Sequence, residues 1–282
     1  MKRLFHKIFN QKASERLRIK QIGGHDTHAI EAGNPRSIAL LAKAYKEVYE
    51  AAFPIDEERE SLESWLGSLT GKNKASKIVI VIAGDNLDSQ TPTLKAISVA
   101  YYYNSTDAGL LAYNAVVPQF QGHGLGRTMV DARKAALLDF AKAHGKPLGG
   151  VFIECNDPAK ITREQDVMDP AVRIKMFEKW GAVALPIDYV QPPLEDGGNK
   201  CDTMKLLAYP HPETGKYPTK EEIKGYLTGI YTELAKKYAV YVAPEENPDY
   251  VRSVEQLDKL DLETFYKTAI ASRQKSQKPP RP

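Results

Sequence analysis

The sequence predicts a mixed α/β fold in which helices flank a sheet. β-branched and aromatic runs, which are typical of strands, alternate with segments in which apolar residues recur every three or four positions, as on one face of a helix. The expected order is a strand, two helices, three strands, a helix, a strand, a helix and two strands. This order favours a mixed sheet that is covered by helices.

Changes in the hydrophobic period locate the individual elements. The expected strands lie at residues 16–22, 78–83, 93–103, 109–117, 151–155, 183–189 and 203–208. The expected helices lie at residues 35–53, 57–69, 125–144, 170–180, 219–238 and 253–271. Pro118 has no N–H for a ladder hydrogen bond and ends the strand before it, and Gly145 is a C-cap for the helix at 125–144.

Four segments are expected along the chain. Residues 1–15 form a basic N-terminal segment, and residues 16–209 form one domain that contains the whole predicted sheet. Residues 210–271 are a helical C-terminal extension, because two helices have too little core to be an independent domain. Residues 272–282 are basic and rich in proline, so we expect a disordered tail.

Composition narrows the class of protein. The 282 residues carry 39 Lys and Arg against 36 Asp and Glu, and a net charge of +3 favours neither nucleic acid nor an anionic membrane as a partner. No run approaches the roughly 20 apolar residues that span a bilayer, so we expect a soluble protein. Cys155 and Cys201 lack the spacing of metal ligands, so we expect no metal and a reducing cytoplasm. The sequence does not decide the oligomeric state, and a homodimer stays open.

The most informative segment is a strand end, a glycine-rich turn and a helix start at residues 116–127. Glycines at 122, 124 and 126 let successive N–H groups point at one spot, and the helix start adds its positive end, so the segment predicts a pyrophosphate site. A tight turn or a dinucleotide-binding loop are the alternatives. The dinucleotide fingerprint needs Gly-x-Gly-x-x-Gly at the start of a series of βαβ units, which this sequence lacks.

This segment resembles the Gln/Arg-x-x-Gly-x-Gly/Ala motif of the GNAT superfamily of acyl-CoA N-acyltransferases, and the resemblance covers about residues 16–209. It implies a mostly antiparallel sheet and acetyl-CoA as the acyl donor. Val116 and Val117 would give backbone hydrogen bonds to the pantetheine arm. The residues that would hold the pyrophosphate are Gln121, Gly122, His123, Gly124, Leu125, Gly126 and Arg127. Arg127 has a second reading as a charge on the helix surface.

The reaction requires the amine to lose a proton and the departing CoA thiolate to gain one. The resemblance implies that Glu154 accepts the amine proton, directly or through water. Its alternative is a charge paired with a neighbouring strand or solvated at a sheet edge. Asn156 would touch the cofactor arm, or it is an ordinary turn residue before Asp157.

The group that protonates the thiolate is not evident from the sequence. Many family members carry a tyrosine where this chain has Phe177, and phenylalanine cannot donate a proton. Tyr113 or Tyr189 could substitute, water could protonate the thiolate, or the protein binds acyl-CoA without efficient turnover. Tyr113 is the candidate acid. The commoner role for a tyrosine on such a strand is a structural one, with the side chain buried in the core.

Two segments are expected near the acceptor. Residues 157–169 form a long polar link, or simply a solvated loop, and the acidic residues within 53–59 either grip a cationic amine or favour a helix N-terminus. His123 fills a variable motif position and has no expected catalytic role. We expect an N-acetyltransferase that acts on a small-metabolite amine by direct attack in a ternary complex. The alternatives are a catalytically weak acyl-CoA-binding sensor or interaction module, and a protein N-acetyltransferase.

Overall fold

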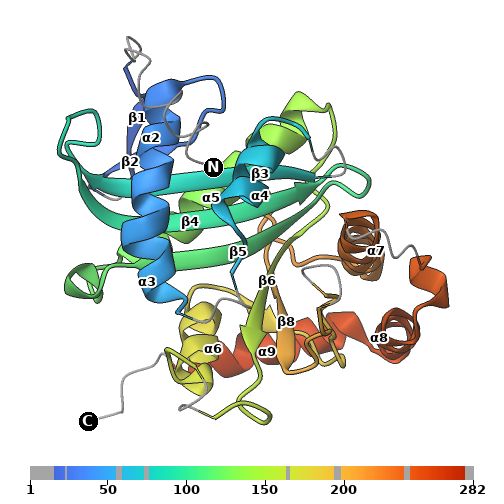
Figure 1. The fold of residues 1–282 in the computed structure, drawn as a ribbon. Coiled ribbons are helices and arrows are strands. Elements are labelled where there is room, and N and C mark those ends of the chain that lie inside the picture. The colour runs from blue at the N-terminus through green and yellow to red at the C-terminus, as the bar shows by residue number, and fades with distance from the viewer. Residues whose placement is uncertain are drawn as a thin grey trace, which may run out of the picture. The chain divides into compact units, whose positions relative to one another are not determined.

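The computed structural model describes residues 16–22, 24–54, 59–72, 76–162, 166–193, 198–237 and 242–276 (Figure 1). The chain divides into two compact units. The first comprises the chain up to Tyr102 together with Leu111–His144, and the second comprises Tyr103–Leu110 and the chain from Gly145 onward. The predicted boundary at residue 209 therefore does not separate compact units. The predicted limits of an acetyltransferase domain stay a prediction.

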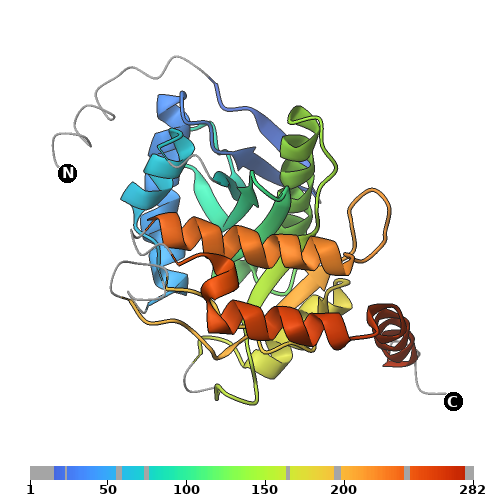
Figure 2. The same cartoon turned by 90° about the vertical axis from the view of Figure 1, so that its right-hand side faces the viewer.

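The first unit is a sheet between two layers of helices (Figures 1 and 2). Its strands follow the order β1 (Ile19–Ile22), β2 (His25–Ala29), β3 (Ser76–Asp85), β4 (Thr93–Tyr103) and β5 (Ala108–Val116), and the last two run on into the second unit. β1 pairs antiparallel with β2, and β2 pairs antiparallel with β3. Strand β2 was not predicted, because its sequence HDTHA has no apolar alternation.

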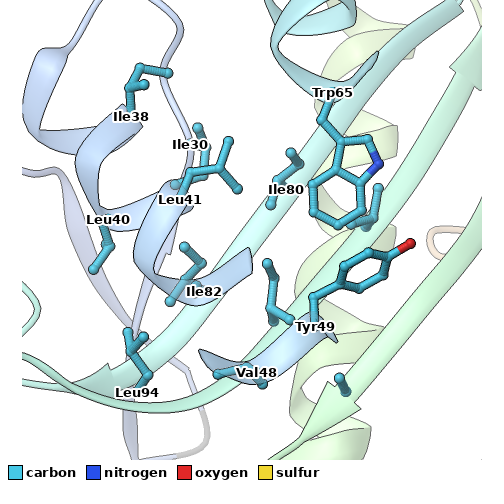
Figure 3. Packing of buried hydrophobic residues seen from close by; sticks show 14 of the residues in the cluster. Ile30, Ile38, Leu40, Leu41, Val48, Tyr49, Trp65, Ile80, Ile82 and Leu94 are labelled. Carbon is cyan, nitrogen blue, oxygen red and sulfur yellow. The ribbon is translucent and has the colours of Figure 1, made fainter. Parts of the chain in front are cut away.

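One face of this sheet is covered by α2 (Pro35–Ala44), the π-helical turn η1 (Tyr45–Tyr49), α3 (Glu50–Ala52) and α4 (Leu62–Leu69), and the other face by α5 (Leu125–Ala143). Asn34 caps α2 by accepting from the N–H groups of Arg36 and Ser37 at 3.0 and 3.2 Å. Figure 3 shows Leu41 and Trp65 packed over the sheet, and both are fully buried.

The helix expected at 57–69 begins later than predicted. Ser61 is its N-cap and accepts from the N–H of Ser64 at 3.1 Å, so residues 59–61 are not helical. Residues 57 and 58 lie outside the described part of the chain. An N-cap serine holds the backbone in an extended conformation, and here that conformation sets the helix start.

The second unit is built on β6 (Val151–Asn156), which pairs in parallel with β5 at Gly109–Val151 and Leu110–Phe152. β6 pairs antiparallel with β8 (Met204–Tyr209), and β8 pairs antiparallel with β7 (Val183–Ala184). Helix α6 (Pro170–Lys179) starts at its cap Asp169 and agrees with the sequence. The predicted fold class, a mixed and mostly antiparallel sheet flanked by helices with further helices at the C-terminus, is confirmed.

The C-terminal helices belong to this second unit. They are α7 (Lys220–Lys237), the short turn η5 (Pro244–Glu246), α8 (Pro248–Lys259) and α9 (Leu262–Ser276), and α7 lies beside α8 (Figure 2). The single helix expected at 253–271 is wrong, because Asp261 accepts from the N–H of Thr264 at 3.1 Å and starts a new helix there. No helix within the described ranges is both long and apolar enough to cross a membrane.

Two further boundaries differ from the prediction. The strand expected at 183–189 is only Val183–Ala184, because Pro186, two residues beyond its end, has no N–H to donate to a neighbouring strand. The disordered tail expected from residue 272 is wrong as far as Ser276, where α9 ends. Arg273 holds this end of α9 by donating to the carbonyl of Ala182 at 2.7 Å and to the hydroxyl of Tyr217 at 3.1 Å. Residues 277–282 and residues 1–15 lie outside the described part.

Candidate active site

The glycine-rich turn is shaped first by backbone bonds at the end of β5. The N–H of Val117 donates to the carbonyl of Lys95, and the carbonyl of Val117 accepts from the N–H of Phe120, both at 2.9 Å. The side-chain amide of Gln121 donates to the carbonyl of Val116 at 2.9 Å. Gln121 therefore closes the turn with its side chain. Val116 and Val117 were expected to give backbone hydrogen bonds to the pantetheine arm, and the N–H of Val117 already has Lys95 as its partner.

The turn itself depends on two glycines. Gly122 and Gly124 have φ angles of 81° and 82°, in the left-handed region that side chains disfavour. Both glycines are exposed, and a Cβ atom at either position would meet no atom within 4 Å. The requirement for glycine here is therefore conformational, and the space over the turn is open to a ligand that fits against the backbone.

Helix α5 begins directly at Gly124, which has no side chain to cap it. The first turn carries no acidic residue, so no carboxylate on that turn neutralises the positive end of the helix dipole, and the first N–H groups of the helix have no partner within it. Leu125 is buried and fixes the helix start, and Asn114 donates to the carbonyl of Gly126 at 3.3 Å. A helix start without a side-chain cap is the kind of site at which proteins bind phosphate and other anions.

The side chains of Arg127 and His123, in and beside the turn, have few contacts that indicate a function. Arg127 is about half exposed, and its guanidinium lies 3.7 Å from the carboxylate of Asp131 one helical turn further on. This contact agrees with the interpretation of Arg127 as a charge on the helix surface. Arg127 nevertheless lies in the first turn of α5, beside the glycine turn. His123 is exposed, as expected from its variable position in the motif.

A buried arginine ties this region together. Arg133 of α5 has no exposed surface, and its guanidinium donates to the carbonyls of Val99 and Tyr113, both at 2.9 Å. A third bond runs to the carbonyl of Met129 at 3.3 Å. Arg133 therefore links α5 to β4 and to β5, the strand that leads into the glycine turn. The sequence carried a signal for it, because position 133 lies on the apolar stripe of α5.

The candidate acid Tyr113 lies in an aromatic cluster. Its ring makes edge contacts with Tyr49 and Phe53 at 5.1 and 5.3 Å between centroids, and a tilted contact with Trp65 at 6.1 Å. Tyr49 and Trp65 are fully buried, whereas Tyr113 is partly exposed. This packing agrees with the structural reading of Tyr113, and the exposed part of its side chain leaves the catalytic reading open to test.

The candidate base Glu154 lies on β6 in the second unit, with both carboxylate oxygens engaged. Oε1 accepts a short hydrogen bond from the hydroxyl of Tyr189 and a longer one, 3.3 Å, from the hydroxyl of Tyr226. Oε2 accepts from the side-chain amide of Gln191 at 2.7 Å. Burial raises the pKa of Glu154 above its ordinary value, and the three hydrogen bonds oppose that rise by favouring the charged form. Glu154 is therefore neither solvated at a sheet edge nor paired with a cation among these groups.

Asn156 shares the face of Glu154 on β6 and is held by charged neighbours. Its amide donates to Asp166 at 2.8 Å, and Arg173 of α6 binds the same carboxylate with two bonds of 2.6 and 2.8 Å. The alternation along β6 places residues 152, 154 and 156 on one side. Asn156 is thus part of a network that joins β6 to the link at 157–169, whose residues 163–165 lie outside the described part.

Other residues named from the sequence have structural surroundings. Phe177 is buried in α6 with its ring 5.7 Å from Trp180. Burial raises the pKa of the Cys155 thiol to about 11, and Cys201 is a free cysteine whose sulfur lies 3.1 Å from the hydroxyl of Thr203. Among the residues that the structure describes, no group of three His, Cys, Asp or Glu side chains is placed to hold a metal ion.

The two units divide the candidate residues. Tyr113 and the glycine turn belong to the first unit, and Glu154 and Asn156 belong to the second. The sequence missed Gln191 and Tyr226 as partners of Glu154, and it named Tyr189 only as a substitute acid. No local signal could have found these partners, because they lie 35 to 72 positions away along the chain.

Comparison with known protein families found no matching family, and comparison with curated proteins found no match. Among solved structures, the chain is similar to a GNAT-family acetyltransferase from Bacteroides thetaiotaomicron, with 17% identity and a TM-score of 0.43 over 65% of this chain and 85% of the other. It is also similar to a GNAT-family acetyltransferase from Elizabethkingia anophelis that has acetyl-CoA bound (16% identity, TM-score 0.39, 66% of this chain, 98% of the other).

A third similar structure is the ribosomal-protein-S18-alanine N-acetyltransferase of Escherichia coli, with 14% identity and a TM-score of 0.39 over 68% of this chain and 96% of the other. Each of these three structures is described as that of an acetyltransferase. With identities below 20% and TM-scores below 0.5, these matches do not indicate the function of this chain.

Proposed function

We propose that this chain is an N-acetyltransferase that moves an acetyl group from acetyl-CoA to an amine. The observation that carries the proposal is the turn at residues 121–126, in which two exposed left-handed glycines lead into a 19-residue helix without a side-chain cap. A pyrophosphate bound there would accept hydrogen bonds from backbone N–H groups and gain from the helix dipole, with no need for a metal.

The acyl donor would be held by backbone groups more than by side chains. Gln121 would act by keeping the turn closed through its bond to Val116, and Leu125 by anchoring the helix start. Arg127 would add a positive charge beside the phosphates. Because the N–H of Val117 is already bonded to Lys95, contacts of this residue with the pantetheine arm would fall to the second lone pair of its carbonyl, which also accepts from the N–H of Phe120.

In the proposed reaction the amine nitrogen attacks the thioester carbonyl carbon within a ternary complex. A C–N bond forms and the C–S bond breaks, so the amine must release a proton and the CoA thiolate must take one up. Glu154 would accept the amine proton, directly or through water. Three of the roughly four lone-pair positions of its carboxylate have partners, which leaves one for this proton.

The proton for the thiolate would come from Tyr113 or from water. Tyr189 is a weaker candidate, because its hydroxyl donates to Glu154 and its pKa is raised well above the ordinary tyrosine value by burial and by the neighbouring carboxyl. A hydroxyl with a raised pKa gives up its proton less readily. Asn156 would touch the cofactor arm, and its bond to Asp166 would fix the orientation of its side-chain amide.

The acceptor that we propose is a small-metabolite amine in the cytoplasm, and a protein N-terminus or lysine is the alternative. A second function has one specific observation in its favour. Phe177 is buried where many GNAT enzymes have the tyrosine that protonates the thiolate, which favours a sensor that binds acyl-CoA without efficient turnover. Release of CoA from acetyl-CoA in the presence of an amine panel separates the enzyme from the sensor.

The experiment that tests the donor site is calorimetric titration with acetyl-CoA of the parent and of Gly124→Glu. The matched control is Gly124→Gln, which has the same strain at this φ and the same size without the charge. We expect binding to the parent, weaker binding to the Gln variant and none to the Glu variant, because the added carboxylate lies at the helix start. Equal binding by all three folded proteins, or none by the parent, would contradict the proposed function.

A further inference from the structure

Helix α7 reaches the carboxylate that we propose as the base, although it belongs to the predicted C-terminal extension. Its residue Tyr226 is fully buried, and the ring stacks on Phe152 of β6 with 4.4 Å between centroids. Phe152 and Glu154 lie on the same face of β6, two residues apart. A ring that stacks on Phe152 therefore brings its hydroxyl to Glu154, and the distance to Oε1 is 3.3 Å.

Two glycines let α7 come this close. A Cβ atom at Gly229 would lie 2.9 Å from the hydroxyl of Thr106 and 3.2 Å from the Cβ of Tyr103, which is too short for an ordinary contact. Gly225, one turn earlier on the same helix face, would place a Cβ atom 3.6 Å from Thr106. Tyr226 lies between these glycines, and its ring also makes an edge contact with Tyr103 at 6.0 Å.

We propose that Tyr226 of α7 is a positioning residue that holds the Glu154 carboxylate for proton transfer, so that the C-terminal helices form part of the catalytic machinery. This inference rests on the proposed function. Tyr189 and Gln191 come from the segment before β8, and Tyr226 from α7, so two separate segments of the chain hold the carboxylate. A carboxylate with three donors has one orientation, which is what a general base needs in order to meet its proton.

The side chains that donate hydrogen bonds to the Glu154 carboxyl in the described part of the second unit are all uncharged. They are Tyr189, Gln191 and Tyr226, and the strand residue opposite Glu154 is Leu206. Tyr231, five residues further along α7, donates to the carbonyl of Val190 at 2.8 Å and steadies the segment that carries the other two donors. The donors therefore act on Glu154 through hydrogen bonds and not through a counter-charge.

The test compares Tyr226→Phe with Tyr250→Phe in the full chain. Tyr226→Phe keeps the ring that stacks on Phe152 and removes only the hydroxyl. Tyr250→Phe removes a hydroxyl that bonds to Thr228 of the same helix at 2.9 Å, with no contact to Glu154, so it is the matched control. The readout is a pH titration of the Glu154 side-chain carboxyl by ¹³C NMR, assigned by comparison with Glu154→Gln.

Loss of a donor to the ionised carboxylate raises its pKa, so we expect an increase of about 0.5 to 1 unit in Tyr226→Phe and none in Tyr250→Phe. The acidic limb of the kcat profile should move by the same amount, kcat should fall several-fold, and the Kd for acetyl-CoA should stay within twofold of the parent. An unchanged Glu154 pKa in an active Tyr226→Phe variant would overturn this inference alone. A parent that binds no acetyl-CoA would overturn the proposed function, which the calorimetric titration detects separately.

Discussion

At the scale of single residues, Glu154 decides how the proposed reaction depends on pH. Burial raises its pKa above the ordinary value of 4.5, and only the ionised carboxylate can accept a proton. We therefore expect kcat to rise with pH through this raised value. Glu154→Gln should lower kcat by about 10²- to 10⁴-fold and abolish that rise, with the affinity for acetyl-CoA unchanged, as measured by steady-state kinetics and calorimetry. A Gln variant with the parent's kcat would remove Glu154 from the mechanism.

The same residue links pH to stability, and the sign follows from the direction of the shift. Because the folded pKa lies above the unfolded one, the contribution of Glu154 to the free energy of unfolding is fully present below pH 4.5. It is lost as pH rises through the folded value. Urea unfolding of the parent over this range should show the decline, and Glu154→Gln should lack this part of it.

The residues of the candidate site differ in how well their roles can be predicted from the sequence. The glycine turn could be predicted from six consecutive residues, because left-handed φ angles and helix starts are local properties. Arg133 could have been predicted, since a charged residue within an apolar stripe must find partners when the stripe is buried. The partners of Glu154 could not, because nothing near Glu154 in the sequence indicates which distant tyrosine hydroxyls will face it.

At the scale of elements, a strong hydrophobic period was sufficient to predict a helix or a strand. Polar segments without such a period were not predicted correctly. The predictions at 93–103, 151–155 and 219–238 agree with β4, β6 and α7 within about a residue at each end. β2 escaped prediction because its pairing with β1 and β3, and not its own pattern, makes it a strand. The split between α8 and α9 depends on one N-cap residue, Asp261. The sequence does not reveal this split, because the apolar stripe continues across Asp261.

The packing of α7 gives a prediction at this scale. Ala in place of Gly in a helix interior normally stabilises by about 0.5 to 1 kcal/mol, and the contact expected at Gly225 is an ordinary one. Gly225→Ala should therefore be at least as stable as the parent. Gly229→Ala should lose about 1 to 2 kcal/mol, because its Cβ atom would press on Thr106 and Tyr103. Urea unfolding measures both, and equal effects of the two changes would show that α7 can shift without cost.

At the scale of the whole molecule, the sequence predicted one domain with an appended pair of helices, and the contacts group the chain differently. The C-terminal helices share a compact unit with β6 and β8, and the strand pair β4 and β5 continues from one unit into the other. The sequence could not predict this grouping, because it arises from pairings between residues far apart in the chain, such as Tyr226 with Phe152 and Arg273 with Ala182. Local periodicity locates elements and leaves their partners undetermined.

Whether the acetyl group passes directly to the amine or first to the protein is a property of the complete enzyme. The described cysteine nearest to Glu154 in sequence, Cys155, is buried with its pKa raised to about 11, so very little of it is the nucleophilic thiolate at neutral pH. We therefore expect direct transfer: initial rates at varied acetyl-CoA and amine should give intersecting double-reciprocal lines. Mass spectrometry after incubation with acetyl-CoA alone should find no acetylated cysteine. Parallel lines together with an acetyl group on Cys155 would instead establish a covalent intermediate, and Cys155→Ser would then abolish turnover.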